Sequence, residues 1–278
     1  MNALQKTVLV IVVLISTQLI AQEEGKQYDR VFPLYAQNVI DMGLDLAHPY
    51  GVSLVYNYTE QDFILDDLSI FAKDGSEVEI DSIVALQNAK PASHSVQVKV
   101  DTFVLPFLNV FAMAGVISGE TPLDVTIKRT VKPDLNFSVD AAVKGYNFTG
   151  GMMFATAYEN YFISVPVSYT YSMLERSYDY RKVISVVPRF GNIISFQEYG
   201  KVAVFMGANY MDVDLKSKGE FVDETGRILV YEVQQKNVDK WNMSLGYNWM
   251  FNKEMSWTFE VGFLSSRQNL TTGLNYRF

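Results

Sequence analysis

Trp-Asn-Met-Ser-Leu-Gly-Tyr-Asn-Trp, residues 241–249, alternates strictly between large apolar side chains and small polar ones. A period of two residues predicts a β-strand, whose side chains point to opposite faces in turn. The polar face of this segment carries asparagine, serine and glycine but no charge. A solvent-exposed sheet face is usually charged, whereas the crowded interior of a barrel is not. This segment therefore favours a β-barrel with apolar residues outside and polar residues inside.

The same alternation recurs along the chain, most clearly in residues 95–104, 161–173 and 256–264. These runs reach ten to thirteen residues, longer than the five or six typical of sandwich strands. About 9–11 tilted residues are enough to cross a bilayer. Aromatic residues cluster at the ends of the runs, where membrane-interface girdles are expected. We expect an all-β, antiparallel, up-and-down transmembrane barrel of about 12 strands, with 10–14 as the range, and keep a soluble sandwich as the alternative.

Composition excludes several other classes. The 278 residues include no cysteine, 23 basic and 31 acidic side chains, and carry a formal net charge of -8. Without cysteine there is no disulfide scaffold, zinc ribbon or cysteine nucleophile. The acidic balance argues against a nucleic-acid partner. A mean hydropathy of +0.04 is too low for a bundle of membrane-spanning helices.

The N-terminus has the order of a secretory signal peptide. Lys6 supplies a positive charge, residues 8–15 are apolar, and Ala21 precedes the polar Gln22. The apolar run is shorter than the ~20 residues of a spanning helix. We expect a signal peptide at 1–21, an N-terminal periplasmic or plug segment at 22–49, and the barrel at 50–278.

The C-terminus ends with Thr-Thr-Gly-Leu-Asn-Tyr-Arg-Phe, residues 271–278, which alternates to the last residue. Its pattern resembles the terminal-strand signal of Gram-negative outer-membrane β-barrels, with Gly273, Tyr276 and Phe278 as the signal residues. Residues 105–111, Leu-Pro-Phe-Leu-Asn-Val-Phe, resemble a branch of the same group. The resemblance covers essentially the whole mature chain. It implies a bacterial outer-membrane location, with membrane lipid, lipopolysaccharide and the barrel-assembly machinery as partners, and leaves the oligomeric state open.

Alternation also assigns a set of polar and charged residues to the interior. A dry sandwich core could not bury these charges, whereas a lumen can hydrate or pair them. The residues expected to line the lumen are Lys99, Asp101, Asn109, Asp124, Lys128, Arg189, Lys201, Glu260 and Arg277.

No catalytic, cofactor or metal site is expected. His48 and His94 are the only histidines, and Ser95 adjoins His94. Adjacent residues of a strand point to opposite faces, so this pair cannot form a catalytic dyad there.

Three functions follow from these residues. The leading hypothesis is an integral outer-membrane barrel that acts as a channel for small solutes. The alternative is a closed, non-conducting barrel that serves as an envelope scaffold or interaction surface. A lipid-modifying enzyme is disfavoured by the histidine geometry.

The signal-peptide pattern predicts cleavage after Ala21, because small residues precede signal-peptidase sites. N-terminal sequencing of the protein isolated from cell envelopes should begin at or near Gln22. Recovery of intact Met1 in that fraction would contradict the prediction.

Overall fold

The computed structural model describes residues 27–42, 46–72, 75, 82–87, 91–128, 135–174, 180–222, 226 and 228–278. Within these ranges it describes only the backbone at 65–68, 82–87, 120–128, 135–143, 180, 217, 219, 221–222, 231 and 233. The signal-peptide prediction for 1–21 lies outside the described residues. The strands are β1 (Tyr50–Gln61), β2 (Phe63–Ala72), β3 (Ser82–Gln87), β4 (Ala92–Leu105), β5 (Leu108–Lys128), β6 (Leu135–Tyr158), β7 (Tyr161–Leu174), β8 (Tyr180–Val186), β9 (Arg189–Phe196), β10 (Gly200–Val222), β11 (Ile228–Asn237), β12 (Trp241–Met250), β13 (Met255–Phe263) and β14 (Arg267–Arg277).

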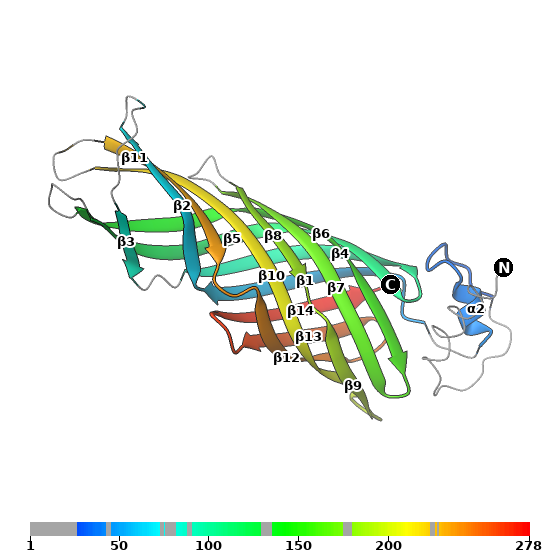
Figure 1. Cartoon of the computed structure of the whole chain (residues 1–278). Helices are drawn as coiled ribbons and strands as arrows, with labels where there is room; N and C mark the ends of the chain where they lie inside the picture. Colours follow the sequence, from blue (N-terminus) through cyan, green and yellow to red (C-terminus); the bar gives the residue numbers. More distant parts are fainter. Residues whose placement is uncertain are drawn as a thin grey trace, which may run out of the picture.

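The sheet closes on itself as a barrel (Figure 1). Going round, the order is β1-β4-β5-β6-β7-β8-β10-β12-β13-β14, and β14 pairs with β1. β9 continues the line of β8 after a break at Pro188, because both strands pair with β7 and β10. In the described part of the chain the ring therefore has ten staves, within the expected range and fewer than twelve. The prediction of a closed, antiparallel all-β barrel is confirmed.

Three further strands extend the wall beyond the ring. The β13–β14 hairpin turns at residues 264–266. Beyond this turn, β2 pairs directly with β11. Asp62 makes the junction, since its N–H donates to Ser266 O at 2.9 Å and its carbonyl accepts from Val238 N at 3.3 Å. β3 pairs with the upper part of β5. The chain bends at Asp62, between β1 and β2. As a result, β1 pairs with β14 and β4 in the ring, whereas β2 pairs with β11 in the extension.

Polar residues face the inside of the ring, and apolar residues face outward. On β12, Met243 and Leu245 are 45% and 48% exposed, whereas Ser244 between them is 1% exposed. β4 follows the same rule, with Val98 exposed and Gln97 buried. The alternation read from the sequence thus places the apolar residues on the outer surface. Buried polar and charged residues of the interior are Ser53, Gln61, Ser95, Gln97, Asp101, Asn109, Asn147, Thr149, Ser164, Ser172, Asn209, Gln235, Asn237, Asn242, Ser244, Glu260 and Arg267.

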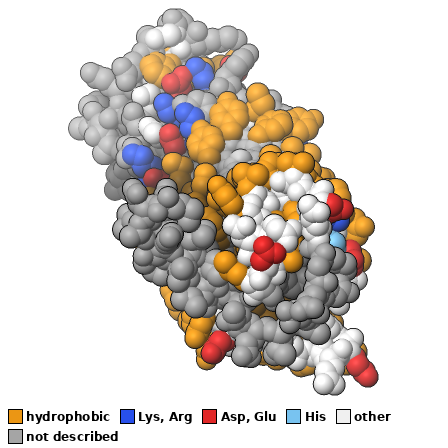
Figure 2. All heavy atoms as spheres, turned by 90° about the vertical axis from the view of Figure 1, so that its right-hand side faces the viewer, with side chains coloured by type: hydrophobic (Ala, Val, Ile, Leu, Met, Phe, Trp, Pro, Cys, Tyr) orange, Lys and Arg blue, Asp and Glu red, His pale blue; other side chains and the backbone are white. Residues whose placement is uncertain are grey.

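Aromatic rings gather on the outer surface toward the end of the barrel that holds the C-terminus. Tyr161 stacks on Phe190 with ring centroids 5.9 Å apart, and Tyr276 lies 6.0 Å from Phe278. The Trp249 indole donates to Tyr199 O at 2.8 Å. Hydrophobic side chains cover much of the described surface seen from this end (Figure 2). Such a girdle suits a bilayer interface, where a ring needs an apolar body and a polar partner.

Residues 27–42 lie beyond the same end of the barrel (Figure 1). Their helix, α2 (Ala36–Ile40), has five residues. Leu34 N donates to Val104 O at 2.8 Å and ties the segment to the end of β4. None of the helices in the described residues is long and apolar enough to cross a membrane.

The outward face predicts where lipid lies. Because the chain has no cysteine, single cysteines at 245 and 244 can carry a fluorophore without background labelling. In phospholipid vesicles, a lipid-soluble quencher should quench the probe at 245 and leave the probe at 244 bright. Leu245→Arg should cost about 2–4 kcal/mol of folding free energy, since it places a charge in hydrocarbon.

Met243 and Asn242 provide a matched second pair on the same strand, one residue outward and one inward. Equal aqueous labelling at 242–245 would contradict a membrane-facing outer surface.

Candidate functional site

A cluster of charged side chains lies in the lumen near the C-terminal end of the ring, around Asp101, whose side chain is fully buried. Its Oδ1 accepts hydrogen bonds from Arg277 Nη1 at 2.8 Å and Asn109 Nδ2 at 2.6 Å. Lys99 Nζ lies 3.5 Å from Asp101 Oδ2. Two cations thus surround one carboxylate, so we name Lys99, Asp101, Asn109 and Arg277 the Asp101 cluster.

The strand register explains why these residues meet. Gly51 of β1 lies opposite Asp101 of β4 on one side and Arg277 of β14 on the other. A Cβ at position 51 would lie 2.5 Å from Asp101 Oδ2 and 3.0 Å from Arg277 Nη1. Glycine therefore leaves the space through which the two charged side chains reach each other.

Arg277 also fastens the chain that enters the barrel. Its Nε donates to His48 O at 2.8 Å and its Nη2 to Pro49 O at 3.0 Å, while its guanidinium lies 4.6 Å from the centre of the Phe103 ring. One side chain near the C-terminus thereby holds β4 and the residues before β1.

This end has short connections, 106–107, 159–160, 197–199 and 251–254. Short turns mark the periplasmic side of outer-membrane barrels.

A second ion pair lies on another part of the wall. Arg189 of β9 bonds Glu260 of β13, and the glutamate side chain is 3% exposed. The Arg189 guanidinium also lies 5.2 Å from the centre of the inward-facing Phe205 ring. Gly246 makes room for that ring, since a Cβ there would lie 2.7 Å from Phe205 Cζ.

Between these clusters, short polar side chains on different strands bond each other, either between neighbouring strands or from β4 to β6 over β5. Such bonds satisfy the inward polar groups without salt bridges. The pairs are Gln97–Thr149 at 3.3 Å, Thr149–Thr170 at 2.8 Å, Asn147–Ser95 at 3.2 Å, Asn275–Ser53 at 2.7 Å and Thr271–Asn57 at 2.8 Å.

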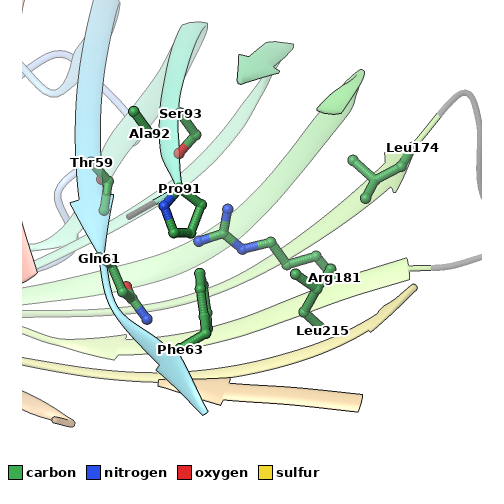
Figure 3. Close-up of a pocket in the computed structure, with 9 residues that line it drawn as sticks. All are labelled: Thr59, Gln61, Phe63, Pro91, Ala92, Ser93, Leu174, Arg181 and Leu215. Atoms are coloured by element: carbon green, nitrogen blue, oxygen red, sulfur yellow. The ribbon is translucent and has the colours of Figure 1, made fainter. Parts of the chain in front are cut away.

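A pocket lies toward the end of the lumen away from the Asp101 cluster, where β2 departs from the ring. It is lined by residues of β1, β2, β4, β7, β8 and β10, and Figure 3 shows Arg181 of β8 reaching toward Gln61 and Pro91. Gln61 is 2% exposed, and both atoms of its amide lack a hydrogen-bond partner among the described residues. Arg267, opposite Gln61 in the β1–β14 register, is fully buried. The lining residues are Thr59, Gln61, Phe63, Pro91, Ala92, Ser93, Leu174, Arg181 and Leu215.

The residues expected to line the lumen have different placements. Lys99, Asp101, Asn109 and Arg277 come together, and Arg189 meets Glu260 separately. Lys201 lies on the same face of β10 as the inward-facing Ala203 and Phe205, but it is exposed at the start of that strand. The side chains of Asp124 and Lys128 lie outside the described ones.

Sequence reasoning missed Gln61, Arg181 and Arg267. Strand parity is the signal that could have found them, because each occupies an inward position of β1, β8 or β14. None of the three lies in the runs where the alternation is clearest, residues 95–104, 161–173, 241–249, 256–264 and 271–278.

The three residues of the terminal-strand signal occupy both faces. Gly273 faces inward opposite Val55, and Tyr276 and Phe278 are half exposed on the outer face. Phe278 N donates to Tyr50 O at 2.9 Å, so the last residue still pairs with the first strand.

The histidine–serine pair points to opposite faces, as the alternation argument predicts. His94 lies on the outer face, with Nδ1 2.7 Å from Tyr56 Oη, while Ser95 faces inward and accepts from Asn147. Among the described residues, no group of three His, Asp or Glu side chains has the geometry of a metal site.

These features define an integral outer-membrane β-barrel: a closed sheet, an apolar and aromatic outer surface, and a polar interior. No family model matches the sequence, and no curated protein matches it. Among solved structures, the outer membrane protein OprG from Pseudomonas aeruginosa is similar, with TM-score 0.39 and 12% identity over 84% of this chain and 98% of that one.

Two other solved barrels show a comparable likeness. The β domain of the Bordetella autotransporter BrkA has TM-score 0.38 and 9% identity over 82% of this chain and 99% of that chain. The Ralstonia pickettii toluene transporter TbuX has TM-score 0.35 and 9% identity, covering 84% and 90%. At these scores the class rests on the closed sheet and its surface.

The Arg189–Glu260 pair predicts a large asymmetry between single and double substitutions. Glu260→Leu leaves a guanidinium uncompensated in the lumen and should cost about 3–5 kcal/mol of unfolding free energy. Arg189→Met together with Glu260→Leu should recover most of that loss. Urea unfolding in phospholipid vesicles, followed by tryptophan fluorescence, measures both.

Glu232→Leu is the matched control, because Glu232 pairs with Lys218 where both side chains are exposed. Its cost should stay below about 1 kcal/mol. Equal losses in Glu260→Leu and Glu232→Leu would contradict a buried pair.

Proposed function

We propose that this barrel is a channel for small solutes in the bacterial outer membrane, closed at its periplasmic end by the Asp101 cluster. The observation that carries the proposal is the polarity of the interior, where buried polar and charged residues outnumber buried apolar ones among the described residues. A polar wall lets water and solutes replace internal hydrogen bonds at little cost, whereas a dry apolar core would not.

The contacts of the Asp101 cluster can be released. Arg277 and Lys99 retain 15% and 22% exposure, so water reaches the cations of the Asp101 cluster although Asp101 itself is buried. Outside its salt bridge to Asp101, Arg277 bonds only the two backbone carbonyls of residues 48 and 49 within the described chain. Movement of the N-terminal segment would therefore release two of its hydrogen bonds.

A closed, non-conducting barrel is the second candidate. The tight burial of Asn109 and Ser244, each 1% exposed, favours it, since these side chains occupy the lumen rather than line a wide pore. In this reading the ion pairs act as permanent internal struts, and the outer surface and extended strands carry the function.

The remaining assignments belong to the same proposal. Residues 22–49 serve as a periplasmic segment, which the position of α2 beyond the barrel end supports. Gly273, Tyr276 and Phe278 are read by the barrel-assembly machinery, and lipopolysaccharide covers the outer leaflet face. The protein has no enzymatic activity of its own, and residues 105–111 place it in a branch of the outer-membrane barrels.

Conductance of the refolded protein in planar bilayers tests the channel. The wild-type protein should give small, discrete openings, because the Asp101 cluster closes most of the lumen. Arg277→Ser should raise the open-channel conductance by about twofold or more, since it removes the largest side chain of the cluster. Gln268→Ser, on the outward face of the same strand, is the control and should conduct like the wild type. Silence of both wild type and Arg277→Ser would favour the closed scaffold.

A further inference from the structure

Charge is distributed unevenly between the interior and the whole chain. The chain carries a net charge of -8, yet cations outnumber carboxylates on the inward positions of the described strands. Asp101 and Glu260 are each matched by a partner. The inward cations are Lys99, Arg181, Arg189, Arg267 and Arg277, together with the exposed Lys201.

Two of these cations have no acidic partner. Arg181 and Arg267 make no ion pair within the described residues. Gln61 lies beside both, since it lines the pocket with Arg181 and is opposite Arg267 in the β1–β14 register. Asp239, whose charge also acts on Arg267, accepts a hydrogen bond from Ser266 N at 3.0 Å through its Oδ2. Two like charges near each other inside a protein are unfavourable unless something neutralises them.

Their hydrogen-bonding capacity is also unfilled. Arg267 is fully buried and uses Nη2 to bond Asn209 O at 2.8 Å, which leaves its Nε and Nη1 without partners. Arg181 Nε lacks one too, and so do both amide atoms of Gln61, which lies beside Arg267 and lines the pocket with Arg181. Donors that are buried, cationic and unpaired normally mark the place of an anionic acceptor.

The site is far from the closed end of the barrel. Ten residues of β1 separate Gly51, at the Asp101 cluster, from Gln61, at the pocket, or about 33 Å along the strand. A solute held at Gln61 would thus lie on the outer side of the closure.

We propose that Arg181, Arg267 and Gln61 form a binding site for an oxyanion group, a carboxylate or a phosphate, on a small solute that enters the lumen from outside. The guanidinium forks supply paired N–H donors to the oxygens, and the Gln61 amide supplies a further donor. Transport of the bound solute rests on the proposed channel. The binding site itself does not.

Isothermal titration of the refolded full-length protein in detergent tests the site, with inorganic phosphate and succinate as separate probes in constant sodium chloride. At least one of the two should bind, and the identity of the tighter probe tells which oxyanion the site prefers. Arg181→Gln and Arg267→Gln should each weaken binding at least tenfold, roughly the value of one charge-assisted hydrogen bond.

Lys182→Gln is the matched control, because Lys182 follows Arg181 on the same strand and shares the outward parity of Ile184. It should bind like the wild type. Heat-modifiable migration on gels verifies that each variant is folded. If a glutamine variant misfolds, Arg181→Lys keeps the charge, removes the fork and should still weaken binding.

Failure to bind either probe by the folded wild-type protein would overturn the site, as would unchanged binding in both arginine variants. Conductance is an independent readout. Binding without conductance leaves the site standing and rejects the channel, and conductance without binding does the reverse.

Discussion

The whole architecture depends on one constraint: inside a bilayer, every backbone N–H and C=O must find a partner within the protein. A sheet meets that requirement only when it closes. Here two pairings close the ring, β1 with β14 over eleven residue pairs and β10 with β12 over ten. The hydrogen bonds between Tyr50 and Phe278 carry the seam to the last residue.

Closure also decides the chemistry of the interior. Once lipid surrounds the outward apolar side chains, the alternating residues must fill a narrow lumen, where buried polar side chains outnumber apolar ones such as Phe205 among the described residues. Small amides and hydroxyls satisfy each other across staves, and glycines at 51 and 246 make room for large groups. The two ion pairs join strands that are not neighbours, since β1 lies between Asp101 and Arg277, and β10 and β12 lie between Arg189 and Glu260.

The same packing leaves an electrostatic imbalance. Asp101 is paired with Arg277 near the C-terminal end of the ring, and Glu260 is paired with Arg189. Arg181 lines the pocket and Arg267 lies opposite Gln61, and neither has a carboxylate partner among the described residues. An acidic protein thus contains a cationic interior, and the proposed binding site rests on the contrast between its paired and unpaired cations.

The sequence by itself determined the class and the two faces of the strands. Alternation in residues 241–249 placed Leu245 outside and Ser244 inside, since strand parity is a local property of the backbone. Sequence reasoning also assigned Asp101 and Arg277 to one interior, but it could not tell that they touch. That contact depends on the register of β1 against both β4 and β14, which is set by the closure of the ring and not by any local pattern.

Tertiary structure alone decided the number of staves, the bend at Asp62 and the cationic pocket. β8 and β9 count as one stave only because both pair with the same two neighbours. Arg181 and Arg267 are 86 positions apart in the sequence, and the closed barrel places both of them beside Gln61. Long-range strand pairing brings such residues together, and no short stretch of sequence encodes it.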